Sequence, residues 1–87
     1  LEELQDCIAH SANVEREIEG RELTAAINSF LGTLSAFDRN VFVCRYWYLD
    51  PVRDIAKAAH ASESRIKSIL FRLRKKLRKY LTEEGLL

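Results

Sequence analysis

Apolar side chains recur along this chain with the spacing of a helix rather than with the strict alternation of a strand. Residues 63–81 show this best, because an apolar side chain falls at every third or fourth position. These side chains would line one face of a single long helix; they are Ile66, Ile69, Leu70, Leu73 and Leu77. The pattern predicts an all-α fold, a small bundle of roughly four or five helices that ends in a helix-turn-helix.

Short polar residues indicate where the helices begin. Ser35 and Asp38 have the S-x-x-D form of a capping box, which predicts a helix starting there. Asp50 and Pro51 predict an N-cap followed by proline at the first helical position, where its missing N–H is tolerated. Ser62 is the next N-cap candidate, directly before the long helix.

The helix expected after Ser35 is apolar nearly all round. One side would carry Phe37, Val41, Cys44 and Tyr48, and much of the remainder Phe42, Val43, Tyr46 and Trp47. Such a helix is either central in the domain or offers a second apolar face to a partner. The pattern leaves both interpretations open.

The N-terminal third is harder to assign. Val14 and Ile18 share one helical face, whereas a second apolar set lies roughly opposite: Leu23, Ile27, Phe30, Leu31 and Leu34. This change of side indicates a break near Gly20, or one helix with two buried faces. We expect residues 1–22 to be an acidic linker or first helical segment, and residues 23–87 to form the domain.

The net charge of +1 is very unevenly distributed. Residues 1–34 hold seven acidic and two basic residues, which gives −5, and residues 63–87 hold eight basic and three acidic residues, which gives +5. A basic end suggests a face that binds a polyanion, although a solvated helix face would look the same.

Two helices are predicted to meet at a tight turn around residues 60–62. A small residue, Ala56, would let them cross closely, and Ile66 would fill the angle between them. The pattern is that of a helix-turn-helix, whose second helix enters a major groove. His60 stands where glycine is common, and histidine tolerates a left-handed backbone at some cost. A plain helical hairpin could show the same apolar pattern, and the basic outer face favours the helix-turn-helix.

That outer face supplies candidate DNA contacts. Arg65 and Lys67 could donate to guanine, while Ser64 and Ser68 could donate or accept. Glu63 could accept from a cytosine amino group or simply favour the helix N-terminus. Arg72 and Lys75 are better placed for phosphates. The aromatic Phe71 would pack on a thymine methyl or a sugar, or else on a neighbouring helix.

Enzymatic and metal-dependent functions find little support. No histidine has an evident carboxylate or nucleophile partner, and there is no glycine-rich phosphate loop, so we expect a non-enzyme. Cys7 and His10 form only half of a zinc site, which needs four ligands, so no metal or cofactor is expected. With two widely spaced cysteines and no apolar stretch long enough to span a bilayer, the chain fits the cytoplasm.

The run from Ile27 to Leu77 resembles region 4 of bacterial sigma-70 family sigma factors, most of all the extracytoplasmic-function type. Four features carry the resemblance. They are an L-x-x-L-x-x-x-x-R-x-V-F opening (Leu31, Leu34, Arg39, Val41, Phe42), Arg45-Tyr46, Asp54-Ile55-Ala56, and Ser64 to Ser68 leading into Arg72, Lys75, Lys76 and Leu77. The sequence departs from the family at Asp54, where glutamate is commoner, and at His60, where glycine is common.

The resemblance implies binding to the −35 promoter element and to the β-flap of core RNA polymerase, and it leaves open an anti-sigma factor as a further partner. By position, Ser62 to Ser68 would lie at the major groove, with Arg53 and Arg72 near phosphates. The polymerase groove would involve Phe30, Leu34, Val41, Phe42 and Tyr46. Residues 1–22 would be a linker from region 2.

Two other functions compete with this interpretation. A free-standing helix-turn-helix regulator would usually dimerise on a palindromic site, whereas a sigma domain is expected to be a monomer outside the holoenzyme. A protein-interaction adaptor using the aromatic helix would show no salt-dependent DNA affinity. Self-association of the isolated chain through that helix also remains open.

Overall fold

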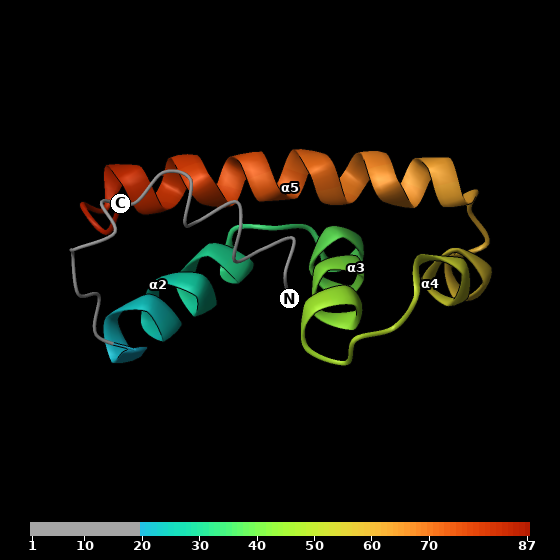
Figure 1. Cartoon of the computed structure of the whole chain (residues 1–87), viewed down its shortest axis with the longest axis horizontal. Helices are drawn as coiled ribbons and strands as arrows, with labels where there is room; N and C mark the ends of the chain where they lie inside the picture. Colours follow the sequence, from blue (N-terminus) through green and yellow to red (C-terminus); the bar gives the residue numbers. More distant parts are fainter. Residues whose placement is uncertain (1–19) are drawn as a thin grey trace. The chain divides into compact units, whose positions relative to one another are not determined.

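The computed structural model describes residues 20–87, and within this range every regular element is an α-helix (Figure 1). The helices are α2 (Gly20–Gly32), α3 (Ala36–Tyr46), α4 (Val52–Ala59) and α5 (Glu63–Glu83). The all-α prediction is confirmed. The Cys7–His10 pair, the apolar residues Val14 and Ile18 and the proposed linker lie largely or wholly outside the described residues. The expected break near Gly20 is likewise untested, because α2 begins at that residue.

The chain divides into two compact units, and α5 belongs to both. The described residues of the first unit are 20–33 and 74–87, so its helices are α2 and the C-terminal part of α5. The second unit holds residues 34–73 and contains α3, α4 and the N-terminal part of α5. The second unit therefore contains α4, the turn after it and the residues of α5 up to Leu73.

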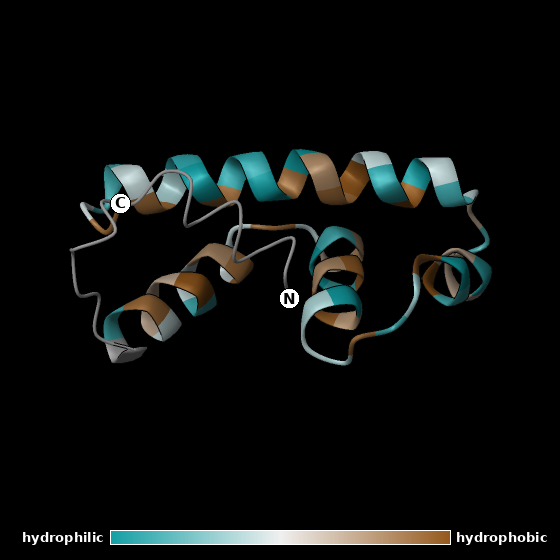
Figure 2. Ribbon diagram, in the orientation of Figure 1, coloured by the Kyte–Doolittle hydropathy of each residue, from teal (hydrophilic) through white to brown (hydrophobic). Residues whose placement is uncertain are grey.

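The core of the second unit is built by one apolar stripe from each of its helices. Its buried residues are Val41, Phe42 and Tyr46 of α3, Ile55 and Ala56 of α4, and Ile66, Ile69, Leu70 and Leu73 of α5. Hydrophobic and hydrophilic residues occupy different faces of α5 (Figure 2). Burying one such aliphatic side chain stabilises the fold by about 1.5–3 kcal/mol. The buried stripe therefore determines which face of α5 is exposed to solvent.

The first unit has a smaller described core. Phe30 of α2 is buried, as are Leu77 and Leu81 of α5. The other members of the apolar set predicted on α2 are half-buried: Leu23, Ile27 and Leu31. The inward orientation predicted for Leu77 is confirmed.

Ser35 caps α3 as the sequence predicts. Its backbone is extended, and its Oγ accepts a hydrogen bond of 3.2 Å from the Asp38 N–H. This bond satisfies one of the free N–H groups of the first helical turn.

The far end of α3 corrects a prediction. The helix ends at Tyr46, so Trp47 and Tyr48 lie in the following turn and do not complete an apolar ring around it. The N–H groups of Tyr48 and Asp50 bond to the carbonyls of Val43 and Cys44, at 3.2 and 2.9 Å. These longer-range bonds replace the α-helical pattern, and Leu49 turns the chain with a φ of 60°.

The start of α4 differs from prediction by one residue. Pro51, not Asp50, is the N-cap, with an extended ψ of 150° and no side-chain capping bond. Its carbonyl accepts the Ile55 N–H at 3.1 Å, which makes Val52 the first helical residue. Proline remains tolerated here because the N-cap N–H takes no part in the helix.

The turn between α4 and α5 is closed by backbone hydrogen bonds around a left-handed residue. His60 has φ 54° and ψ 41°. The Ala61 N–H donates to the Ala56 carbonyl at 2.9 Å, and the His60 N–H to the Lys57 carbonyl at 3.3 Å. This is a Schellman motif, which usually places glycine where His60 stands. Ser62 then caps α5 as predicted, since its Oγ accepts the Arg65 N–H at 3.1 Å.

Candidate nucleic-acid interface

The α4–turn–α5 segment has the internal packing that the sequence predicts for a helix-turn-helix. Ala56 is 4% exposed and Ile66 is fully buried. A larger side chain at Ala56 would separate the two helices, and a polar one at Ile66 would leave the angle between them unfilled. The two residues therefore fix how α5 is presented.

The outward face of α5 is polar and basic. Every residue predicted there is exposed: Ser64, Arg65, Lys67, Ser68, Phe71, Arg72, Lys75, Arg78 and Lys79. By helical geometry, Ser64, Ser68 and Lys75 lie nearest the side opposite the buried stripe. Phe71 is 55% exposed beside them, so its aromatic ring belongs to this face rather than to the core.

Three further candidates lie at the helix ends. Glu63 is exposed in the first turn of α5, where a carboxylate is favoured by the helix dipole. Ser62 is exposed, but its hydroxyl oxygen is engaged in capping. The Nε of Arg53 in α4 lies 3.6 Å from the Oδ1 of Asp54, and both side chains are exposed.

Two arginines of α5 contact the first turn of α3. The Arg72 Nη2 donates to the Asp38 Oδ2 at 3.0 Å. The Arg65 Cζ lies 5.9 Å from the centre of the Phe37 ring, within the range of a cation–π contact. The sequence predicts Phe37 and Asp38 only as residues of this helix. No local pattern links Asp38 to Arg72, which lies 34 positions farther along the chain.

The sequence of this region matches a known protein family. Residues 30–79, more than half of the chain, match the family model described as "Sigma-70, region 4". The chain belongs to this family. Neither a comparison with curated proteins nor one with solved structures gave a match. This sigma-70 region 4 domain is thus a DNA-binding domain of a sigma factor, and the matched range includes α3, α4 and the basic part of α5 through Lys79.

The residues expected to bind polymerase are mostly buried in this region 4 domain. Phe30, Val41, Phe42 and Tyr46 are at most 7% exposed, and Leu34 is half-buried. The rings of Phe42 and Tyr46 pack at a tilt of 57° within the core, with their centroids 4.8 Å apart. A partner could reach these side chains only where they border the surface.

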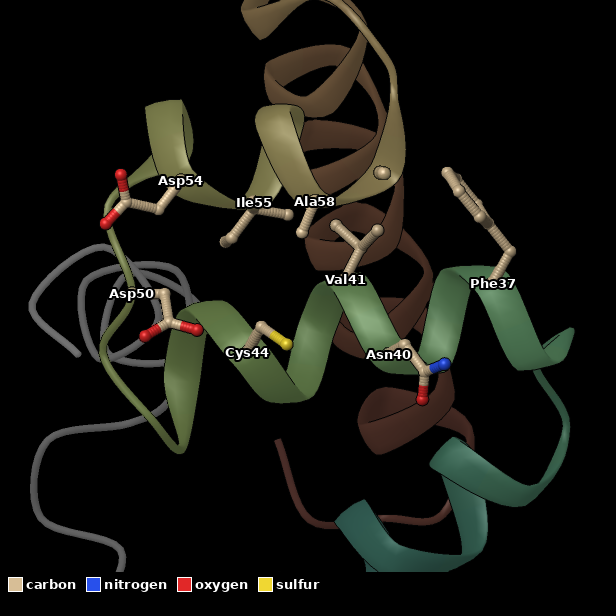
Figure 3. Close-up of a pocket in the computed structure, with 9 residues that line it drawn as sticks. Phe37, Asn40, Val41, Cys44, Asp50, Asp54, Ile55 and Ala58 are labelled. Carbon is tan, nitrogen blue, oxygen red and sulfur yellow. The ribbon is translucent and has the colours of Figure 1, made fainter.

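An open groove of about 320 Å³ runs between α3 and α4 in the second unit. Its lining is mostly apolar, from Phe37, Val41, Cys44, Ile55, Ala58 and Ala59, with Asn40, Asp50 and Asp54 added. Figure 3 shows Asp50 and Asp54 at one end of the groove and Phe37 at the other. Val41 is thus a core residue that also borders a surface groove.

The turn after α3 exposes three successive large apolar side chains. Trp47 is 79% exposed, Tyr48 67% and Leu49 57%. Large apolar side chains grouped on a surface often mark a site of protein contact.

Within residues 20–87, no three histidine, cysteine, aspartate or glutamate side chains gather closely enough to hold a metal ion. None of the described helices combines the length and the apolar character needed to cross a bilayer.

Proposed function

We propose that this region 4 domain recognises the −35 promoter element through the N-terminal half of α5. One observation carries the proposal: α5 buries its apolar stripe and exposes a largely polar and basic face between Ser64 and Lys79, directly after a capped turn. The first turns of a recognition helix reach base edges in the major groove, and residues farther along contact the backbone.

Each candidate side chain has a role in this proposal. Residues at base edges are Ser62, Glu63, Ser64, Arg65, Lys67 and Ser68, with Phe71 against a thymine methyl or a sugar. Arg53 and Lys75 contact phosphates, and Arg72 would do so only when it leaves the Asp38 carboxylate. Ser62 has the smallest part, because its hydroxyl oxygen accepts the Arg65 N–H.

The proposal is tested by selecting duplexes from a random pool with the chain assembled on core RNA polymerase. The selected and random duplexes are then compared by fluorescence anisotropy over a range of salt concentrations. We expect one non-palindromic site and an affinity that falls as salt rises. A palindromic site bound by a dimer would indicate a free-standing regulator, and salt-independent or absent DNA binding would indicate an adaptor.

The domain also docks on the β-flap of core RNA polymerase in this proposal. Family membership and two apolar surfaces support it: the α3–α4 groove, which Val41 borders, and the turn of Trp47, Tyr48 and Leu49. Because Phe42 and Tyr46 lie in the core of the second unit, they support this docking surface from beneath and do not contact the partner directly. Phe30 lies in the core of the first unit. An anti-sigma factor would compete for the same surfaces.

Docking is tested by pull-down of core polymerase or the isolated β-flap. Phe42 is unsuitable for substitution by aspartate, since it is 3% exposed and the charge would disrupt the core. We therefore expect Trp47→Ser and Cys44→Asp to weaken binding, and Lys57→Ser, an exposed change outside the groove, to leave it intact. Equal binding by all three variants would exclude this docking surface.

Oligomeric state and location follow from the same proposal. The domain acts in the cytoplasm on nucleoid DNA, as a monomer outside the holoenzyme. At high concentration the exposed turn of Trp47 would favour weak self-association. Sedimentation across a concentration series tests this, and a constant monomer mass excludes self-association.

A further inference from the structure

Arg65 and Arg72 lie on the same flank of α5. They are two helical turns apart, so their side chains leave the helix in nearly the same direction. Both meet the first turn of α3, Arg65 at Phe37 and Arg72 at Asp38. The recognition helix thus carries two cations whose positions depend on another element of the second unit.

The two contacts leave these cations in different states. The Phe37 ring has neither a charge to compensate that of Arg65 nor an oxygen to accept its N–H donors, so these donors remain available to a base or phosphate. A carboxylate accepts from one of those donors and compensates the charge, so Arg72 is in part neutralised by Asp38. Arg65 is oriented by its contact, whereas Arg72 is engaged.

Asp38 is well placed to hold Arg72. Its side chain is only 16% exposed, against 49% for Arg72, so solvent screens the pair less than it screens a fully exposed ion pair. Asp38 also lies in the first turn of α3, where the helix dipole favours a carboxylate, and the Ser35 cap fixes its backbone.

We propose that Asp38 is a specificity-determining residue that withholds Arg72 from the DNA phosphates. This inference rests on the proposed function of α5 in DNA recognition. A phosphate contact adds affinity on every sequence alike, whereas contacts to base edges distinguish one sequence from another. By compensating the charge of Arg72, Asp38 lowers the affinity for DNA of any sequence. It thereby raises the ratio of the affinity for selected DNA to the affinity for random DNA.

The test compares wild type with Asp38→Asn on a selected duplex and on a random-sequence duplex. Asparagine keeps the shape of the side chain and the capped backbone N–H but removes the charge. We expect tighter binding to random DNA, a lower ratio of selected to random affinity, and a slope of log affinity against log salt steeper by about 0.9, the value of one added phosphate contact. Glu83→Gln, which removes an exposed carboxylate from α5, controls for general charge and is expected to keep the wild-type slope.

A second comparison assigns the effect to Arg72. In an Arg72→Gln background, Asp38→Asn is expected to add no change in slope. Asp38→Glu in the otherwise wild-type chain retains a carboxylate and is expected to keep the wild-type ratio of selected to random affinity. An unchanged or shallower slope for Asp38→Asn, or the same steepening without Arg72, would overturn the proposal. If Asp38→Asn does not fold, as judged by circular dichroism, Asp38→Ser takes its place. A wild-type chain that does not distinguish the selected duplex contradicts the function of α5 itself, not this role of Asp38.

Discussion

The ring of Phe30 packs against the ring of Tyr80, with their centroids 5.7 Å apart and their planes inclined at 52°. Phe30 lies in α2 and Tyr80 near the end of α5, so the contact joins the two described helices of the first unit. Tilted aromatic pairs of this kind contribute about 0.5–1.5 kcal/mol beyond their buried area. Phe30 itself is only 2% exposed.

Phe30→Ala is therefore expected to destabilise the first unit by about 3–5 kcal/mol, the usual range for a buried phenylalanine. In a domain of this size each 1 kcal/mol lowers the Tm by about 4–8 °C, so thermal unfolding followed by circular dichroism detects it. Tyr80→Phe, which keeps the ring, is the matched control and should change the Tm little. A Tm that Phe30→Ala leaves at the wild-type value contradicts the pairing.

A second prediction about stability follows from the left-handed backbone conformation of His60. A residue other than glycine in this conformation carries a strain of about 1–2 kcal/mol. We expect His60→Gly to stabilise the domain by less than that, because glycine also raises the entropy of the unfolded chain. His60→Val should destabilise it, since a branched side chain fits a φ of 54° poorly.

Ala61→Gly is the control for the turn, because Ala61 is not among the residues with a positive φ. There glycine relieves no strain and only adds unfolded-state freedom, a loss of about 0.4–1 kcal/mol. Denaturant unfolding measures all three variants. Stabilisation by both glycines would mean that backbone strain at His60 is not the cause.

The helices could be predicted because their signals are local. The caps Ser35 and Ser62 and the apolar stripe of α5 depend on residues three or four positions apart, and the structure contains each of them. The end of α3 was predicted wrongly for the same reason. The apolar run continues through Trp47 and Tyr48 with helical spacing, while the hydrogen bonds that end the helix come from the backbone of Tyr48 and Asp50.

The candidate site was only partly predictable. The outward orientation of Ser64, Lys67 and Lys75 follows from periodicity, because the buried stripe determines the opposite face. The partners of Arg65 and Arg72 depend on how α3 packs beside α5, and no spacing along the chain specifies that. The burial of Phe42 was left open for a related reason, since an apolar residue looks alike in sequence whether it lies in a core or on a docking face.

A third prediction concerns Arg65. If it donates to a base, Arg65→Ala should weaken binding to the selected duplex by about 1–3 kcal/mol and relax specificity at one base pair. Phe37→Leu keeps an apolar side chain but removes the ring, and should reproduce about 0.5–1 kcal/mol of that loss at the same base pair. Anisotropy against single-base variants of the duplex measures both. An equal loss on every duplex would reassign Arg65 to the phosphate backbone.

Lys75 is expected to behave differently. Lys75→Ala should weaken binding by the same factor on selected and random duplexes, and reduce the salt slope by about one unit, because a phosphate contact is independent of sequence. Lys75→Arg, which keeps the charge, should retain the slope. Sequence-dependent loss in Lys75→Ala would place this residue at a base edge instead.

Ala56 links the packing of the helix-turn-helix to its function. Ala56 of α4 is 4% exposed, and Ile66 of α5 is fully buried. Ala56→Leu forces the helices apart and should destabilise the domain by about 1–3 kcal/mol. Ala58→Leu places the same side chain at an exposed position of α4 and should change stability little. If α4 and α5 bind DNA together as proposed, Ala56→Leu should also lower the ratio of selected to random affinity in the molecules that remain folded. Equal stability of the two leucine variants would show that Ala56 does not set the distance between the helices.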